Sequence, residues 1–403
     1  MRVLISALGL ALGLALTLVT FAYPSSVAPE PRWSAVQAET VWRWLQRAED
    51  DGIAIESSLS IQLRAAIDDN MSARRDALAD EAAMRLLRAF HGQCCGPQMP
   101  ASWHIEQPVT GNTLAAQLDE ALAADRIELL FRAARPGHPY YLALADAHAQ
   151  EREPERRRLL ALNLARWRTL PLPVRGRYVI VNAAAQTLTV WEGTRLIDQR
   201  RVINGTRAAR TPVFATQATG VVLNPWWIIP SSIAAEGIGA MVRRNPAAAR
   251  ERGYIYSAGR YRQMPGDNNA LGRMKLVMPN PFTVFLHDTS NRDLFARDDR
   301  LLSHGCVRVE GAIDFAEILL AGTVWDRAAI DIAIAGGETT TAALAQPVPL
   351  FIAYFTAEPD ASGKVRWLDD VYGRDREAFG LSQAVRRFPY VAGNDGSIGS
   401  DAA

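Results

Sequence analysis

Leu302-Ser303-His304-Gly305-Cys306-Val307-Arg308 places a cysteine between a histidine and an arginine, directly after a glycine. A second stretch, Thr283-Val284-Phe285-Leu286-His287-Asp288-Thr289, brings another histidine 19 positions before the cysteine. A cysteine nucleophile needs a base that takes its proton and hydrogen-bond donors that hold the oxyanion formed when sulfur attacks a carbonyl. Because the two stretches supply both, they predict a cysteine acyltransferase.

The residue types around the cysteine suit this chemistry. A free thiol has a pKa of about 8.5, so only a few per cent is thiolate at neutral pH unless an imidazole or a positive charge stabilises the anion. His287 and Arg308 can both do so. The apolar run from Phe282 to Leu286 is rich in β-forming residues, so we expect a buried strand that ends at His287 and faces a cleft. Gly305 lets the backbone approach a substrate carbonyl without a Cβ in the way.

These residues resemble the L,D-transpeptidases with a YkuD-type catalytic domain, whose signature is a histidine on a strand followed by Ser-His-Gly-Cys and an arginine. The resemblance covers about Arg177 to Arg374 and is strongest to the large, YcbB-like periplasmic members that carry a helical scaffold domain. Further motifs that carry it are Arg210-Thr211-Pro212-Val213-Phe214, Asn224-Pro225-Trp226-Trp227, Ile229-Pro230-Ser231-Ser232-Ile233, Asn269-Ala270-Leu271-Gly272-Arg273 and Pro279-Asn280-Pro281.

By this resemblance, Cys306 is the nucleophile and His287 is its base. The backbone N–H groups around Gly305 and Cys306 would form the oxyanion hole, and the resemblance requires no metal or organic cofactor. The side chains expected to line the substrate site with Gly305 are Ser303, His304, Arg308, Asp288 and Trp227. A zinc site made by His287, Asp288, His304 and Cys306 is a competing interpretation, although the spacing lacks the usual CxxC or HExxH pattern.

The resemblance also implies the substrates. The donor would be a peptidoglycan tetrapeptide stem, cleaved after its third residue, meso-diaminopimelate, with loss of the terminal D-alanine. The acceptor would be the side-chain amine of another diaminopimelate, which gives a 3-3 cross-link, and carbapenems are expected inhibitors. Alternatives are a cysteine L,D-carboxypeptidase, an amidase that releases wall-anchored lipoprotein, and a non-catalytic wall-binding scaffold.

The chain departs from the family pattern at two places. Scaffold-bearing relatives usually carry tyrosine two positions before the base histidine, where this chain has Phe285. Relatives of this size also usually insert a peptidoglycan-binding module between the scaffold and the catalytic domain. Here Ala147 to Pro154 runs almost directly into Arg156 to Arg168, which leaves no room for that module.

Composition and the N-terminal segment indicate an exported globular protein. The chain has 403 residues, 49% of them hydrophobic and 22% charged, which is ample for two domains with their own cores. The net charge of +1 gives no reason to expect nucleic acid. Arg2 precedes an uncharged run from Val3 to Phe21, so residues 1–22 are expected to be a signal peptide, or an anchor in the inner membrane, of a periplasmic protein.

The chain contains three cysteines, which is few for an exported protein. Cys94 and Cys95 are adjacent, so they can bond to each other, pair with other chains or remain free. A disulfide from Cys306 to either of them is the structural alternative to a catalytic thiol.

The pattern along the chain predicts an α+β protein: a helical N-terminal scaffold domain, then a β-rich catalytic domain with a capping loop and a C-terminal β-hairpin. Ser34 is expected to cap a first helix with Gln37 returning the bond, and leucines from Leu114 to Leu122, then Ile127 to Phe131, form an amphipathic stretch. Arg156 to Arg158 is expected at a solvated helix start. Of Trp226 and Trp227, one could pack in the core and the other face the cleft.

The expected segments are a linker over 23–33, the scaffold over 34–170, the catalytic domain over 176–336 with its cap over about 229–280, a hairpin and helix over 346–385 and a tail over 386–403.

Overall fold

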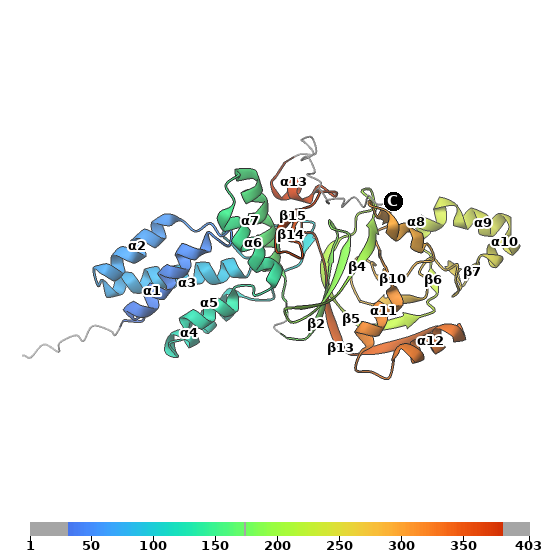
Figure 1. The fold of residues 1–403 in the computed structure, drawn as a ribbon, viewed down its shortest axis with the longest axis horizontal. Helices are drawn as coiled ribbons and strands as arrows, with labels where there is room; N and C mark the ends of the chain where they lie inside the picture. The colour runs from blue at the N-terminus through green and yellow to red at the C-terminus, as the bar shows by residue number, and fades with distance from the viewer. Residues whose placement is uncertain (1–30, 173–174, 382–403) are drawn as a thin grey trace, which may run out of the picture.

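The protein is described by a computed structural model that covers residues 31–172 and 175–381. The expected leader over 1–22, most of the linker and the tail over 386–403 lie outside the described residues. An array of helices forms one end of the molecule, a barrel of β-strands its middle, and small helices and strands cover the other end (Figure 1). The predicted α+β fold, with a helical region before a β-rich domain, is confirmed. Within the described ranges, no helix combines the length and apolarity needed to cross a bilayer.

The scaffold helices form a core of their own. Ser34 caps the first helix through a capping box with Gln37, as predicted. The amphipathic stretch predicted from Leu114 to Phe131 is divided into two helices, because Asp125 adopts a left-handed conformation between them. The helices are α1 (Ala35–Ala48), α2 (Ser57–Asp68), α3 (Ser72–Phe90), α4 (Gly111–Ala123) and α5 (Ile127–Ala134), and their shared core includes Trp33, Val41, Leu63, Leu86 and Phe131.

Two further helices join the scaffold to the barrel. These are α6 (Pro139–Gln150) and α7 (Pro154–Thr169), and their apolar faces share a second core with the outside of the barrel. Arg156 and Arg158 are exposed near the start of α7, as predicted, whereas Arg157 is half-buried and pairs with Glu49 at 2.8 Å. The sequence pattern does not reveal that Arg166 and Arg168, farther along the same helix, are almost fully buried.

Eight strands close into a barrel in the order β5-β13-β2-β3-β4-β12-β10-β9, because β9 also pairs with β5. β1 extends the sheet beside β5, and β11 pairs with β4. The barrel interior and the helices α11 (Ala312–Leu320) and α12 (Arg327–Gly336) form the main apolar core. The strands are β1 (Trp103–His104), β2 (Arg177–Asn182), β3 (Thr187–Glu192), β4 (Arg195–Gly205), β5 (Val213–Leu223), β9 (Met274–Val277), β10 (Leu286–His287), β11 (Leu301–Ser303), β12 (Val307–Val309) and β13 (Thr340–Ala353).

The C-terminal prediction requires correction. Most of the segment between the predicted catalytic domain and the predicted hairpin, Gly336 to Ala345, is the start of β13, which lies in the barrel between β5 and β2. Its alanines are weak β-formers, so pairing with β5, rather than local preference, makes this segment a strand. The hairpin is formed only by β14 (Ala357–Pro359) and β15 (Val365–Trp367), and α13 (Arg374–Ala378) follows it.

The capping segment between Trp227 and Gln263 forms a small unit at the far end of the barrel (Figure 1). Residues 234–244 form a π-helical turn η1 (Ala234–Ile238) and α9 (Gly239–Arg244), with a kink at Gly237, whose φ is +138°. The cap ends earlier than the predicted residue 280, because β9 already belongs to the barrel. The other cap elements are β6 (Trp227–Ile228), α8 (Ser231–Ile233), α10 (Pro246–Glu251), β7 (Tyr254–Ser257) and β8 (Arg260–Gln263).

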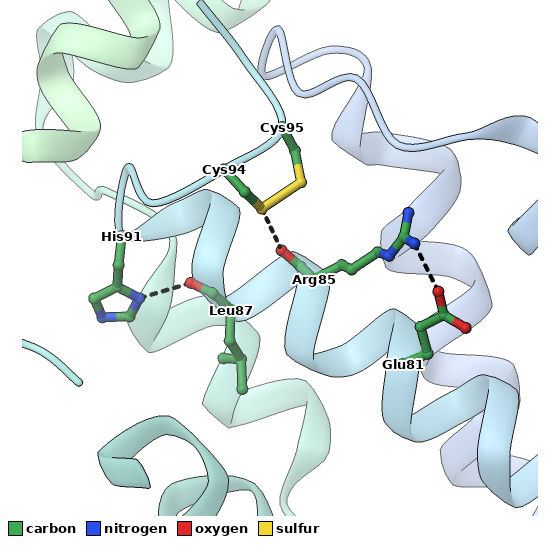
Figure 2. The surroundings of a disulfide bond; sticks show 6 residues. All are labelled: Glu81, Arg85, Leu87, His91, Cys94 and Cys95. Atoms are coloured by element: carbon green, nitrogen blue, oxygen red, sulfur yellow. Dashed lines mark hydrogen bonds and ion pairs between the residues drawn. A yellow bond between two sulfur atoms is a disulfide. The ribbon is translucent and has the colours of Figure 1, made fainter. Parts of the chain in front are cut away.

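Cys94 and Cys95 bond to each other after the end of α3, and the Cys94 sulfur lies 3.6 Å from the Arg85 carbonyl oxygen (Figure 2). Cys306 is the free cysteine. The structure therefore selects the vicinal pairing among the alternatives and leaves the thiol of Cys306 available for chemistry.

Mass mapping checks this assignment. Protein unfolded without a reductant should take up one carbamidomethyl group, at Cys306, and protein unfolded with a reductant should take up three, one for each cysteine of the chain. Three labels without reductant would contradict the pairing.

Candidate active site

The barrel register aligns three polar side chains in a row. His287 on β10 lies opposite Lys275 on β9 and opposite Arg308 on β12. Directly opposed residues of paired strands point to the same face of a sheet. Their neighbours Leu286 and Val307 point to the other face, into the apolar core. Lys275, His287 and Arg308 therefore share the outer face at this end of the barrel.

The cysteine follows a tight turn between β11 and β12. The hydroxyl of Ser303 accepts from the Gly305 N–H at 3.1 Å and donates to the Cys306 carbonyl at 2.5 Å, so it fixes both ends of the turn. Gly305 has a φ of +113°, which L side chains rarely adopt. Cys306 is partly buried and lies two residues before Arg308, which places both on the same face of the chain.

A second layer of backbone supports this turn. The hydroxyl of Thr211 donates to the Gly305 carbonyl at 2.9 Å and accepts from the Gly205 N–H at 2.9 Å. A Cβ on Gly205 would meet the Ala209 carbonyl oxygen at 2.0 Å and the Gly305 Cα at 3.0 Å. Tyr372, from the C-terminal segment, donates to the Gly205 carbonyl at 2.6 Å. The turn is thus held by residues far from it in sequence, and sequence reasoning missed their role in the site.

His287 is buried and has a defined tautomer. Its Nδ1 bonds to the backbone carbonyl of Asp288, which can only accept, so Nδ1 carries the proton and Nε2 keeps its lone pair. Burial lowers the pKa of His287 to about 3, with contributions from the positive charges of Arg308 and Lys275, while backbone hydrogen bonds to Asp288 and Leu271 oppose them. The imidazole is therefore neutral at physiological pH and can accept a proton through Nε2.

Burial also raises the pKa of the Cys306 thiol, which a hydrogen bond from the Phe285 backbone and the charges of Lys275 and Arg308 partly offset. Both pKa shifts favour the neutral forms, because burial disfavours both the thiolate and the imidazolium. At pH 7 the thiol lies below its raised pKa and the imidazole lies above its lowered pKa. At rest the site therefore holds a neutral thiol and a neutral imidazole.

This state predicts the pH dependence of alkylation. The rate at which iodoacetamide labels Cys306 should rise with pH and reach its midpoint above the value of about 8.5 of an ordinary thiol. Labelling is followed by intact mass between pH 5 and pH 10. A rate that is constant from pH 5 to pH 8 would instead indicate a preformed thiolate–imidazolium pair.

The predicted oxyanion hole is only partly available. The Gly305 N–H is already bonded to Ser303, so it does not point to a substrate. The Cys306 N–H has no hydrogen-bond partner among the described residues. We therefore take the Cys306 N–H as the backbone donor that an oxyanion would meet.

Three of the residues predicted to line the substrate site contact other groups instead. The Asp288 carboxylate accepts from the Arg273 N–H at 2.8 Å and pairs with Arg292 at 3.1 Å, so it supports the neighbouring turn. Trp227 pairs with Gln263 in the cap sheet, and neither it nor Trp226, which is 40% exposed, belongs to a core. His304 is exposed and its Nε2 lies 3.0 Å from a Glu236 carboxylate oxygen, which joins the cysteine turn to the cap.

The zinc alternative has no geometric support. Over residues 31–172 and 175–381, no group of three histidine, cysteine or carboxylate side chains is arranged to hold a metal ion. The side chains of Asp288 and His304 point to Arg292 and Glu236 instead.

Sequence reasoning missed Lys275. It lies next to the conspicuous Leu271-Gly272-Arg273 motif, and only the strand register places it beside His287.

A cavity of about 530 Å³ lies away from this site, inside the cap, where Arg243, Arg250, Tyr254 and Tyr261 line it.

A barrel that carries a cysteine turn beside a buried, neutral histidine has the layout of a cysteine acyl-transfer domain. Comparison with known families matches residues 176–332 to the L,D-transpeptidase catalytic domain, YkuD, and residues 26–147 to the scaffold domain. The chain therefore carries an L,D-transpeptidase catalytic domain of the YkuD type after an N-terminal scaffold domain.

One curated protein and several solved structures are similar to parts of this chain. A curated protein of Haemophilus influenzae named "Putative L,D-transpeptidase" is 34% identical over 239 residues, which are 54% of this chain and 48% of that protein. The chain thus spans about half the length of this relative. Among solved structures, an L,D-transpeptidase from Mycobacterium smegmatis is 13% identical, with 44% of this chain and 58% of that chain covered and a TM-score of 0.25. An L,D-transpeptidase solved in complex with imipenem is 13% identical, with 44% and 59% covered and a TM-score of 0.23.

Proposed function

We propose that this protein is a peptidoglycan L,D-transpeptidase that forms 3-3 cross-links through a thioester on Cys306. The observation that carries the proposal is the strand register, which places the buried, neutral His287 opposite Arg308, two residues after Cys306. The arrangement provides a base, a nucleophile and a backbone donor on one rigid face.

The reaction follows from these groups. His287 Nε2 takes the thiol proton as the sulfur attacks the carbonyl of the third stem residue, and the Cys306 N–H stabilises the resulting oxyanion. The tetrahedral intermediate then expels D-alanine, whose amine receives the proton from the imidazolium, and a thioester remains. An acceptor amine attacks the thioester, loses a proton to His287, and leaves as the new amide while the thiol is regenerated.

The proposal includes the substrates named for the family. The donor is a tetrapeptide stem and the acceptor is the side-chain amine of diaminopimelate in a second stem. Water in place of that amine would make the same acyl-enzyme a carboxypeptidase, and an amine of a wall-anchored lipoprotein is a third acceptor. The family match supports action on peptidoglycan as a class, and the acceptor is what the experiment decides.

We also propose a periplasmic location. The support is the sequence of residues 1–22, where Arg2 precedes the uncharged run from Val3 to Phe21. Cell fractionation with an antibody to the scaffold would test it, and recovery of the protein in the cytoplasm would refute it.

Incubation of the purified protein with tetrapeptide muropeptides tests the function. Mass spectrometry should show dimers joined from the third residue of one stem to the third residue of the other, with release of D-alanine. Tripeptide monomers without dimers would assign a carboxypeptidase instead. No release of D-alanine, with the Cys306 thiol intact, would reject the proposal and favour a non-catalytic wall-binding role.

A further inference from the structure

Lys275 and Arg308 flank His287 on the outer face of the barrel, and no carboxylate of the described residues pairs with either of them. We propose that these two side chains form a carboxylate subsite, which holds the terminal carboxylate of the donor peptide one residue beyond the carbonyl that Cys306 attacks. The inference rests on the proposed function and adds the residues that recognise the donor.

The geometry places both charges near the sulfur. The Lys275 ammonium lies 4.7 Å from the centre of the Phe285 ring, and the Phe285 backbone is the segment that hydrogen-bonds the Cys306 thiol. Arg308 follows Cys306 by two residues on the same face. A carboxylate bound between Lys275 and Arg308 would therefore lie over His287 and beside the thiol.

No carboxylate of the described residues is left to balance the two cations of the site. The nearby carboxylates are all engaged elsewhere: Asp288 with Arg292, Glu236 with His304, and Glu310 with Arg201. The Nε of Arg308 is buried without a hydrogen-bond partner among the described residues. Burial lowers the pKa of Lys275 and of Arg308, which is the mark of cations held partly away from water. Unpaired buried charge is costly, so an incoming carboxylate is favoured.

The residue type at position 275 is informative as well. Only two of the 44 basic residues of the chain are lysines, Lys275 and Lys364. A lysine offers a compact charge on a flexible stem, whereas arginine has a wide planar head. The ammonium over Phe285 fits this confined position, and Phe285 in place of tyrosine leaves no phenol to compete for the carboxylate.

Occupation of the subsite would also activate the base. The positive charges of Arg308 and Lys275 help to keep His287 neutral by lowering its pKa. A bound carboxylate offsets these charges, so the imidazole becomes a stronger base only when a donor is present. This couples donor recognition to proton transfer from Cys306.

Two small alkylating reagents test the subsite without any peptidoglycan. Iodoacetate carries a carboxylate next to the carbon that sulfur attacks, and iodoacetamide is its neutral counterpart. The ratio of their rates at Cys306 cancels changes in thiolate content. Lys275→Met should lower this ratio about tenfold, Lys275→Arg should restore most of it, and the exposed control Lys364→Met should leave it unchanged. An unchanged ratio in Lys275→Met would overturn the proposal.

Arg308→Gln provides an independent measurement if Lys275→Met does not fold, because it should lower the same ratio by a similar factor. Folding of each variant is checked by circular dichroism before labelling. An Arg308→Gln ratio equal to that of the unaltered protein would count against the subsite.

Two donor peptides then test whether the subsite recognises the donor carboxylate during acylation. A tetrapeptide stem and its C-terminal carboxamide leave the same acyl group on Cys306, so intact mass compares only their rates. The carboxylate donor should acylate the unaltered protein at least about tenfold faster than the amide, and Lys275→Met should make the two rates equal. Equal rates in the unaltered protein would overturn the subsite. No acylation by either donor would instead refute the proposed function, and the reagent ratio would still decide the subsite.

Discussion

Cys306→Ala is expected to abolish every covalent adduct of the protein with a carbapenem and every turnover of a muropeptide donor. The sulfur is the atom that becomes acylated, so its removal should cost at least about 10⁴-fold in rate, as loss of a nucleophile does in other acyl-transfer enzymes. The fold should survive, because Ser303 bonds the backbone of residues 305 and 306 and does not contact the thiol. Intact mass after incubation with a carbapenem measures the adduct directly.

A matched control is available in the same chain. The double variant Cys94→Ser/Cys95→Ser removes the other two sulfurs and should still form the adduct at the normal rate. His287→Gln keeps the nucleophile but lacks the base, so its acylation should be slower by about 10² to 10⁴. An adduct that persists in Cys306→Ala would show that the assignment of the site is wrong.

The nucleophile and base could be predicted because each lies in a continuous motif. Ser303 to Arg308 is one continuous stretch that forms the turn after β11 and the start of β12, and His287 ends one strand. The functional residues of each motif are therefore neighbours in sequence as well as in space. Lys275 could not be predicted in this way. Its place beside His287 depends on which residues oppose each other between β9 and β10, and a shift of one residue would turn it into the core.

The difference between local and long-range contacts also explains which parts of the fold could be predicted. Helix α1 could be predicted in detail because Ser34 and Gln37 form a local capping box. The first half of β13 could not be predicted as a strand because its small residues have weak preferences of their own, and its pairing with β5 makes it one. The buried Arg166 escapes prediction for a related reason, since its partner lies more than two hundred residues away at Asp375.

Asp375→Ala is expected to destabilise the protein by about 3 to 5 kcal/mol, because it leaves a buried positive charge without its partner. Arg166 on α7 is fully buried, and its Nη1 lies 2.6 Å from an Asp375 oxygen. Burial raises the pKa of Asp375, and the charge of Arg166 opposes that shift. A second guanidinium, Arg374, lies 5.2 Å from the ring of Tyr354, against which Arg166 also packs at 5.4 Å. Without the carboxylate, the charge of Arg166 would lose its ion-pair partner in a buried site.

Denaturant unfolding of the unaltered protein, single and double variants measures this cost. The double variant Arg166→Met/Asp375→Leu should recover most of the stability, because a well-packed apolar pair replaces a buried ion pair at little net cost. The exposed pair of Arg132 with Glu128 serves as the control, and Arg132→Ala should cost less than about 1 kcal/mol. If Asp375→Ala is no more destabilising than that control, the pair does not hold the C-terminal segment to α7.

Asp375→Ala should also slow acylation at the active site. Tyr372 and Arg374, which flank Gly373 just before Asp375, donate to the carbonyls of Gly205 and Thr211. The Thr211 hydroxyl in turn holds the carbonyl of Gly305. If the C-terminal segment loosens in Asp375→Ala, the cysteine turn loses part of its support, so acylation by a carbapenem should slow at temperatures where the protein remains folded. The double variant should restore acylation together with stability. Restored stability with acylation still slow would mean that the charge of Asp375, rather than the docking of its segment, governs the site.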